Sequence, residues 1–239
     1  MKALILNSGA GSRMMSLTEC SPKCMSELST GQTILSRQIK QLERQGMREI
    51  CITTGPFAEE LERHAHESAG SASFYFVNNP DYASTNYIYS IYLAREYLRD
   101  DIILLHGDLV FSEDVLGDIL RLPGSAAVVS STLPLPQKDF KAVITDGLIS
   151  AVGIEFFSEA VAFQPLYKLS KEDWLIWLSE IESFVLRGEK GCYAENAFNA
   201  VSHRCAVYPF DVKERLCLEI DTPEDYDFVN AILSGSDVE

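Results

Sequence analysis

A loop that could bind phosphate groups follows the first apolar run of the chain. Residues 3–6 are apolar, and Asn7-Ser-Gly-Ala-Gly-Ser-Arg13 comes directly after them. Glycines let the backbone turn tightly, so that its N–H groups can approach phosphate oxygens. The loop is not a dinucleotide fingerprint, because the third glycine is missing, and not a Walker A loop, because Gly-Lys-Ser/Thr is absent. Its chemistry must therefore be inferred together with the residues that follow it.

A carboxylate is expected at the end of a strongly apolar strand. Residues 102–106 read Ile-Ile-Leu-Leu-His, and Gly107-Asp108 follow. A strand that is apolar on both faces is typical of the middle of a parallel sheet, and ligands bind outside the carboxyl ends of such strands. A carboxylate at that edge suits Mg²⁺, which takes one or two protein carboxylates together with substrate phosphates. We therefore expect a second aspartate, and Asp221 in the segment 219–225 is the candidate.

The segment around Asp221 also has a structural interpretation. Asp221 or Thr222, followed by Pro223, Glu224 and Asp225, makes a good helix start. It offers a capping side chain, a proline in the first turn and acids near the positive end of the helix dipole. We assign Glu224 and Asp225 to this structural role and Asp221 to the metal.

Composition limits the partners of the protein. The chain has 239 residues, of which 46% are hydrophobic, so it can bury one large core in a single domain. Its formal net charge of −15 argues against binding to nucleic-acid phosphates. An anionic substrate must instead meet local cations, which makes Arg13 and Lys23 informative. Six cysteines without a signal peptide, and no apolar window long enough for a membrane span, predict a soluble cytoplasmic protein with no membrane partner.

Alternating elements would position these residues. Short apolar runs and amphipathic stretches follow one another in the first half of the chain, which predicts an α/β, doubly wound fold with a mostly parallel sheet. The strands are expected at 3–6, 49–53, 73–77 and 101–106, and the helices at 34–45, 57–66 and 86–98.

The pattern changes in the second half. Residues 142–144 and 148–152 flank Asp146-Gly147, which predicts a β-hairpin. A helix at 172–186 carries Trp174 and Trp177, which we expect to pack against the sheet rather than to stack on a ligand. A short strand at 206–209 and a last helix at 223–233 complete the expected elements. We divide the single domain 1–239 into a nucleotide-binding half (1–131), an acceptor-binding part with the small hairpin and helix lobe (132–215), and a closing segment with the second metal aspartate (216–233).

The N-terminal loop and its continuation resemble a known signature. Gly9-x-Gly-Ser-Arg13-Met-x-x-Leu17-Thr-x-x-x-Pro22-Lys23 is similar to the motif of the sugar-phosphate nucleotidyltransferase superfamily, with its Rossmann-like fold. The usual motif reads Gly-x-Gly-Ser/Thr-Arg-Leu, then Pro-Leu-Thr, then Pro-Lys. Here Asn7-Ser8 replaces the usual Ala-Ala and Ser16 replaces a proline, which puts the base preference most in doubt. The segment 219–225 resembles the late motif in which the aspartate after isoleucine binds metal together with the Gly-Asp aspartate.

The resemblance implies roles for the basic residues. Nucleotidyl transfer depends mostly on positioning and on neutralising charge around the α-phosphorus. By resemblance, Arg13 would hold the β- and γ-phosphates, Lys23 would contact the α-phosphate and the incoming phosphate, and Asp108 would complete the catalytic set with Mg²⁺. The alternative is that both basic residues are solvated in a mobile loop.

A later segment narrows the family. Asn79-x-x-Tyr-x-x-x-Asn86-x-x-x-Ser90-x-x-Leu resembles bacterial phosphocholine and phosphonate cytidylyltransferases, whereas hexose-phosphate enzymes tend to have Gly-Thr-Ala here. Asn86 could cap the following helix, and its amide or that of Asn79 could read a base edge, while capping alone stays the alternative. The predicted nucleotide-binding residues are Leu6, Asn7, Ser8, Gly9, Ala10, Gly11, Ser12, Arg13, Lys23, Asn79, Thr85, Asn86, Ser90 and Gly107.

The acceptor would be met by a second group of residues. Asp139-Phe140-Lys141 occupies the place where phosphocholine enzymes have an acid followed by an aromatic residue, and Glu195-Asn196 matches an acidic-Asn pair. An acid with aromatics would suit a cationic amine, and Lys141 could hold the phosphoryl or phosphonyl group. With Lys23, these five residues form the predicted acceptor site, although each of them could equally be a surface or core polar residue.

These observations predict a Mg²⁺-dependent enzyme. It would transfer a nucleotidyl group from CTP to phosphocholine, 2-aminoethylphosphonate or a similar small acceptor, with release of pyrophosphate. One alternative is a hexose-1-phosphate nucleotidyltransferase that uses UTP or dTTP, and another is a non-catalytic nucleotide-sensing subunit. CTP and the acceptor are the expected partners, and a homodimer stays open.

Overall fold

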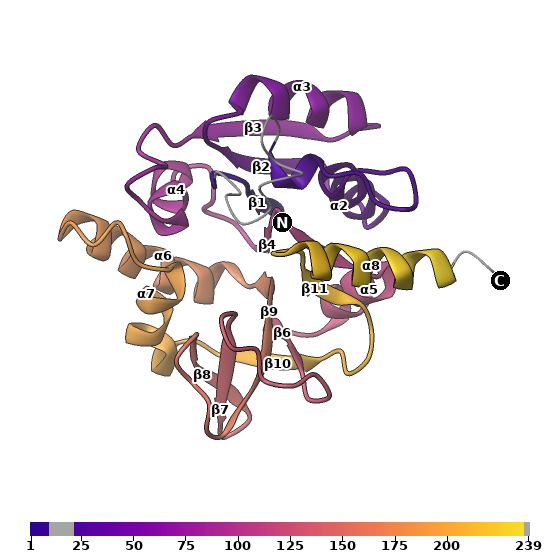
Figure 1. Ribbon diagram of the computed structural model, residues 1–239. Helices are drawn as coiled ribbons and strands as arrows, with labels where there is room; N and C mark the ends of the chain where they lie inside the picture. The colour runs from indigo at the N-terminus through magenta and orange to yellow at the C-terminus, as the bar shows by residue number, and fades with distance from the viewer. Residues whose placement is uncertain (10–21, 237–239) are drawn as a thin grey trace.

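The centre of the molecule is a mixed, mostly parallel sheet. The computed structural model describes residues 1–9 and 22–236, and Figure 1 shows the sheet running through its middle. The strands follow the order β10-β6-β9-β4-β1-β2-β3. β1 is parallel to both β2 and β4, β2 is parallel to β3, and β10 is parallel to β6. The strands of this path are β1 (Lys2–Leu6), β2 (Glu49–Thr54), β3 (Ser73–Asn78), β4 (Ile102–His106), β6 (Ser125–Ser130), β9 (Ala160–Leu169) and β10 (Val207–Asp211).

Helices cover both faces of this sheet. Alternate residues of β1 and β4 enter two different core clusters, with Leu4 and Leu104 in one and Ile5 and Leu105 in the other. One face packs against α4 (Tyr87–Ala94), α6 (Lys171–Leu186) and α7 (Ala194–Val201), and the opposite face against α2 (Ile34–Arg44), α3 (Ala58–Ser68) and α5 (Glu113–Arg121). The predicted α/β class and doubly wound, mostly parallel sheet are confirmed.

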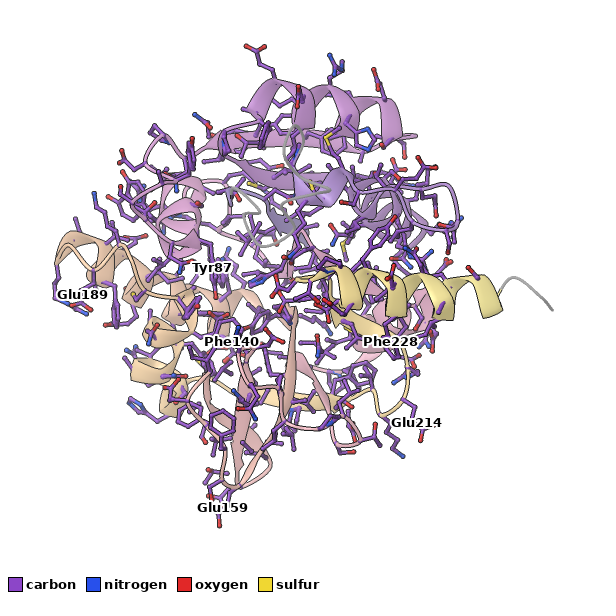
Figure 2. The ribbon with its side chains drawn as sticks, viewed as in Figure 1. Tyr87, Phe140, Glu159, Glu189, Glu214 and Phe228 are labelled. Carbon is purple, nitrogen blue, oxygen red and sulfur yellow. The ribbon has the colours of Figure 1, made fainter. Side chains whose placement is uncertain are left out.

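The predicted hairpin is present beside the main sheet. It consists of β7 (Lys141–Thr145) and β8 (Leu148–Gly153), and β7 also pairs with β9. Asp146 and Gly147 form its turn with φ values of 52° and 79°. Such left-handed pairs match the twist of two-residue hairpins. In Figure 2, Tyr87 and Phe140 lie between α4 and this hairpin.

Strand β9 is the main element that the sequence did not reveal. It runs antiparallel to both β4 and β6 and so separates these two parallel strands. Its register against β6 shifts between Ala127 and Val128, opposite Pro165. A bulge is where a sheet tolerates a proline, because the ladder is already interrupted there. Gln164 and Pro165 interrupt the apolar pattern of this strand, which explains why it was not predicted.

Several other boundaries differ from expectation. Sequence reasoning assigned no element to β5 (Leu109–Phe111), α5, α7 or β11 (Cys217–Glu219). It also extended α4 to residue 98, whereas the helix ends at Ala94. The N–H groups of Tyr97 and Leu98 bond to carbonyls three residues earlier, so the chain leaves the helix through tighter turns.

A small sheet and the last helix close the structure. β5 pairs antiparallel with β11, and α8 (Pro223–Ser236) follows. Val229 and Leu233 of α8 pack on Leu28, Ile34 and Val110. Short 3₁₀ turns occur at η2 (Lys23–Met25) and η3 (Ser202–Arg204). Among the helices of the described residues, none is long and apolar enough to cross a membrane.

Both tryptophans belong to the core, as predicted. Trp174 and Trp177 are 0% and 1% exposed, and their indole N–H groups donate to the carbonyls of Leu98 and Ala194 at 2.7 and 2.9 Å. α6 is therefore attached to the segment after α4 and to the first residue of α7 by hydrogen bonds as well as by apolar contacts.

We predict that Trp174→Ala lowers the free energy of unfolding by about 3–5 kcal/mol, because it leaves a large cavity in the core. Urea denaturation followed by circular dichroism measures this loss. Leu186→Ala at the end of the same helix is the control, since Leu186 is 77% exposed. Equal effects of the two substitutions would contradict the described packing of α6.

Candidate active site

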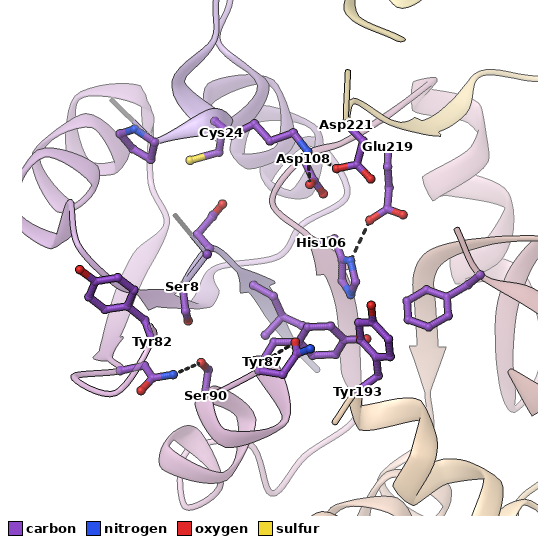
Figure 3. Close-up of a pocket in the computed structure, with 18 of the residues that line it drawn as sticks. Ser8, Cys24, Tyr82, Tyr87, Ser90, His106, Asp108, Tyr193, Glu219 and Asp221 are labelled. Atoms are coloured by element: carbon purple, nitrogen blue, oxygen red, sulfur yellow. Dashed lines mark hydrogen bonds and ion pairs between the residues drawn. The ribbon is translucent and has the colours of Figure 1, made fainter. Parts of the chain in front are cut away.

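A cavity of about 340 Å³ opens at the carboxyl ends of β1 and β4. It collects residues from the first loop, from η2, from α4 and from the segments before β7, α7 and α8, and Figure 3 shows most of them. Its walls contain Leu6, Asn7, Ser8, Gly9, Pro22, Lys23, Cys24, Asn79, Tyr82, Thr85, Asn86, Tyr87, Ser90, His106, Asp108, Lys138, Asp139, Phe140, Ile154, Tyr193, Glu219 and Asp221.

Three charged side chains meet in this cavity. The Lys23 Nζ atom lies 2.6 Å from Asp108 Oδ2 and 2.6 Å from Asp221 Oδ1. These residues come from η2, from the β4–β5 junction and from the β11–α8 junction, and 198 positions separate Lys23 from Asp221. The side chains are mostly buried, with exposed fractions of 11%, 24% and 21%. The structure thus brings together both predicted metal aspartates and the predicted lysine.

The backbone explains how Asp221 reaches Asp108. β11 pairs with β5, and the N–H of Ile220 donates to the Asp108 carbonyl at 3.0 Å. The Asp225 carboxylate accepts hydrogen bonds from the N–H groups of Asp221 and Thr222, and the Asp225 N–H donates to the Thr222 hydroxyl. Thr222 therefore caps the start of α8, and the Asp221 side chain is left to face the cavity.

The charges of these groups stabilise one another. Burial lowers the pKa of Lys23, but the charges of Asp108 and Asp221 outweigh burial and raise it. Burial raises the pKa of Asp108, but the Lys23 and His106 charges outweigh it and lower that pKa. Two carboxylates thus converge on one cationic group. Such a pair of hard oxygen donors also fits Mg²⁺.

A second pair in the cavity was not predicted from the sequence. His106 Nδ1 lies 2.8 Å from Glu219 Oε1, and ligand atoms of these two residues and of Asp108 lie within 4.8 Å of one another. Burial lowers the pKa of His106, but the hydrogen bond and charge of Glu219 raise it to about 9. The available signal was position: His106 ends the strand before Gly107-Asp108, and Glu219 precedes Asp221 by two residues.

The described part of the first loop forms one wall. Leu6, Asn7, Ser8 and Gly9 line the cavity. Asn7 Nδ2 and Ser8 Oγ are buried without a hydrogen-bond partner in the part of the chain that the structure describes. Both residues line the cavity, so these two groups are candidates for contact with a ligand. The predicted residues Ala10, Gly11, Ser12 and Arg13 lie outside the described residues, and their roles stay predictions.

Gly107 makes room for the Asn7 side chain. A Cβ atom at position 107 would lie 1.6 Å from Asn7 Oδ1. Gly107 itself is absent from the cavity wall, and its effect on the cavity is exerted through Asn7.

The predicted nucleotide-binding residues between positions 79 and 90 make hydrogen bonds within their own segment. Asn79 Nδ2 donates to Thr85 Oγ1 and Ser90 Oγ, both at 3.0 Å, and Asn79 Oδ1 accepts from the Asp81 N–H. Asn86 Oδ1 accepts from the Tyr87 N–H at 2.7 Å, so its capping of α4 is confirmed. All four predicted side chains line the cavity, and base reading by Asn79 or Asn86 stays a prediction.

The predicted acceptor residues separate into two groups. Asp139 and Phe140 line the cavity, whereas Lys141, Glu195 and Asn196 do not. Lys141 is 0% exposed and donates to the Ile154 carbonyl at 2.5 Å. Asn196 Oδ1 accepts from the Tyr193 N–H in the first turn of α7. The structure does not place these three side chains in the wall of this cavity, and their contact with an acceptor stays a prediction.

Glu195 instead supports the aromatic side of the cavity. It is 2% exposed and accepts hydrogen bonds from the hydroxyls of Tyr87 and Tyr167, the latter at 2.6 Å. Burial and the Glu195 charge raise the pKa of both tyrosines. The acid lies in the first turn of α7, where the helix dipole stabilises it.

Tyr87, Phe140 and Tyr193 form what we call the aromatic wall. The ring of Tyr193 lies 5.0 Å from Phe140 and 5.9 Å from Tyr87, measured between centroids. Tyr87 also meets the His106 ring edge-on at 4.9 Å. Because Glu195 holds the Tyr87 hydroxyl, this wall presents ring surfaces to the cavity.

The model of the MobA-like NTP transferase domain matches residues 3–137. The chain belongs to this family. Within it, the predicted resemblance to phosphocholine and phosphonate cytidylyltransferases is confirmed by the relatives described next.

Curated relatives with named activities match the N-terminal part of the chain. A CMP-5'-(3-aminopropyl)phosphonate synthase from Streptomyces rubellomurinus is 31% identical over 152 residues, 61% of this chain and 24% of that protein. A CTP:phosphoglutamine cytidylyltransferase from Campylobacter jejuni is 27% identical over 54% of this chain and 52% of its own length. The chain thus spans about half or less of the curated relatives it matches.

Solved structures match over nearly the whole chain. The CTP:phosphocholine cytidylyltransferase of Streptococcus pneumoniae superposes with a TM-score of 0.79 at 23% identity, covering 97% of this chain and 98% of that one. The inositol-1-phosphate CTP transferase of T. maritima gives 0.81 at 21% identity, covering 98% and 94%. These similarities show that the family fold extends through the hairpin and α8.

We predict that Tyr87→Phe lowers the free energy of unfolding by about 1–3 kcal/mol, because the buried Glu195 carboxylate loses one of its two donors. Chemical denaturation at neutral pH measures the change. Tyr89→Phe on the same helix is the matched control. A loss no larger than that of the control would mean that the Tyr87–Glu195 hydrogen bond does not support the aromatic wall.

Proposed function

We propose that the chain is a Mg²⁺-dependent cytidylyltransferase. It transfers CMP from CTP to a small phosphate or phosphonate and releases pyrophosphate. The observation that carries the proposal is the convergence of Lys23, Asp108 and Asp221 in one cavity, beside the unpartnered polar atoms of Asn7 and Ser8. The names of the relatives point to the same reaction with CTP.

The reaction requires few proton transfers from the protein. An anionic oxygen of the acceptor bonds to the α-phosphorus of CTP while the bond from that phosphorus to the bridging oxygen of pyrophosphate breaks. The acceptor oxygen is already deprotonated, so charge neutralisation and alignment are the main requirements. Lys23 supplies a cation that is held inside the cavity, and Arg13 is the predicted second cation.

The two aspartates would hold the metal. Asp108 and Asp221 offer oxygen ligands from two rigid junctions, and Glu219 and His106 lie close enough to orient them. When bound, Mg²⁺ neutralises charge on the phosphates and helps to align them.

The acceptor half has a separate chemical character. The aromatic wall lies with Asp139 and Glu219 in the same cavity. Aromatic faces together with carboxylates favour a cation, so we infer an acceptor that carries an amine as well as its phosphoryl or phosphonyl group. Phosphocholine and 2-aminoethylphosphonate both have this composition, and a hexose 1-phosphate does not.

We predict that pyrophosphate is released with CTP and an amine-bearing acceptor. Asp108→Asn and Asp221→Asn should each lower kcat/KM by about 100-fold or more, because charge near the reacting phosphates is no longer balanced. The assay tests four NTPs against phosphocholine, 2-aminoethylphosphonate and glucose-1-phosphate, with and without Mg²⁺. Glu214→Gln, an exposed acid outside the cavity, is the matched neutralisation. Turnover with a hexose phosphate alone would overturn the acceptor class, and full activity without divalent metal would overturn the metal role.

We also predict that Gly107→Ala raises the KM for CTP by about 100-fold. The added methyl group would displace the Asn7 side chain from its place in the cavity wall, where it is proposed to contact the nucleotide. Gly191→Ala is the control, since a Cβ there meets nothing within 4 Å. A KM for CTP that is unchanged in Gly107→Ala would show that Asn7 does not contact the nucleotide.

A further inference from the structure

A second, smaller cavity adjoins the first. It measures about 190 Å³, which corresponds to roughly six water molecules. Asp139 and Glu219 line both cavities and so form the partition between them. The remaining lining residues come from the segment before β7, from β9 and from the β11–α8 region, and they include Ala162, Gln164, Asp225 and Phe228.

Gln164 is the polar group at the base of this cavity. Its side chain is 8% exposed, and it makes no hydrogen bond with any other residue that the structure describes. It lies on β9 two positions after Ala162, so both side chains project from the same face of the strand into the cavity. Its side-chain N and O atoms are not fully enclosed by protein, so they face the solvent of the cavity. A ligand with a complementary group would take the place of water at this amide.

The surrounding walls are mostly apolar. Leucine, proline, alanine and valine side chains form the sides, and Phe228 of α8 forms an outer edge. The Phe228 side chain is 56% exposed, so part of its ring surface is free to contact a ligand at the rim of the cavity. Figure 2 places it on the side of α8 that faces the half of the molecule containing Phe140.

We propose that this cavity is a subsite for the tail of the acceptor, the part that extends beyond its amine, and that Gln164 recognises a neutral group with both a hydrogen-bond donor and an acceptor, such as a carboxamide. This inference rests on the proposed function. It deepens that function because it makes the substrate longer than a simple two-carbon aminophosphonate.

The charges around the cavities favour a neutral tail. Asp139, Glu219 and Asp225 line the smaller cavity, so an anionic tail would be repelled. A cationic amine meets Asp139 and Glu219 at the partition before it reaches Gln164. Asp225 also accepts hydrogen bonds at the start of α8, and Glu219 pairs with His106. The group that reaches the base of the cavity is therefore uncharged, and the apolar walls accommodate the short hydrocarbon chain that carries it.

The test compares two acceptors that differ only in the tail. One is 2-aminoethylphosphonate with a carbamoylmethyl group on nitrogen, and the other carries an isobutyl group of the same shape. Turnover of each with CTP gives a ratio of kcat/KM values. We expect the wild-type protein to favour the carboxamide by about tenfold, the effect of one or two hydrogen bonds in a buried site. In Gln164→Leu the preference should disappear or reverse.

Controls separate the subsite from the fold. Leucine is tolerated in a buried strand, and a ratio measured within one variant cancels any general loss of activity. Gln45→Leu makes the same chemical change at an exposed position on α2's end and should keep the wild-type ratio. Phe228→Ala should weaken both long acceptors together, because it removes the outer edge without changing hydrogen bonding.

The outcomes distinguish this inference from the proposed function. Turnover of plain 2-aminoethylphosphonate with CTP, but an equal ratio in wild type and Gln164→Leu, would overturn the subsite and leave the function intact. Absence of turnover with every acceptor would count against the function. In that case, isothermal titration calorimetry with the same two acceptors tests the subsite. Tighter binding of the carboxamide by the wild-type protein, lost in Gln164→Leu, would support the subsite. Equal affinity of the wild-type protein for the two acceptors would refute it.

Discussion

One ammonium group held between two carboxylates organises the site. Lys23 bonds to Asp108 and Asp221 at 2.6 Å each, and all three side chains are largely buried. Removing one partner of such a group leaves an uncompensated charge, which costs several kcal/mol. The pairing therefore requires η2, the end of β4 and the start of α8 to meet at one point. The β5–β11 ladder and the apolar contacts of α8 supply this geometry, so these small elements hold the aspartates beside Lys23.

The cavity has two regions of different chemical character. Near Lys23 the walls offer charges and unpartnered polar atoms on rigid junctions, which suits phosphate groups. Farther away, ring surfaces and the acids Asp139 and Glu219 replace them. Glu195 belongs to this second region although it does not face the cavity, because it fixes the ring of Tyr87 from behind. In a chain with a net charge of −15, two of its own carboxylates thus hold the Lys23 cation in place inside the cavity.

Sequence reasoning found what local patterns encode and missed what long-range contacts create. The alternating elements, the hairpin turn and Asp108 were predicted, because periodicity and a strand end are visible in a few residues. Asp221 was found by a different route, from the expectation of a second carboxylate and from the motif in residues 219–225. β9 was missed because Gln164 and Pro165 interrupt its pattern and only its neighbours make it a strand. Lys141 and Glu195 were assigned to the acceptor from a resemblance to phosphocholine enzymes, and a resemblance in sequence does not reveal which way a side chain turns: neither side chain lines the larger cavity. The His106–Glu219 pair depends on the fold in the same way.

The antiparallel strand β9 has a consequence for how the chain is made. β4 and β6 do not pair with each other, and each bonds to β9 instead. On a ribosome, the first 130 residues therefore emerge with unsatisfied edges on β4 and β6. The edges that face β9 remain open until residue 169 has left the exit tunnel, and the other edge of β6 remains open until β10 follows. Exposed edges of this kind are sites of intermolecular pairing. The segment matched by the family model, residues 3–137, is for the same reason not a closed folding unit, and its sheet becomes continuous only when the later half of the chain inserts into it.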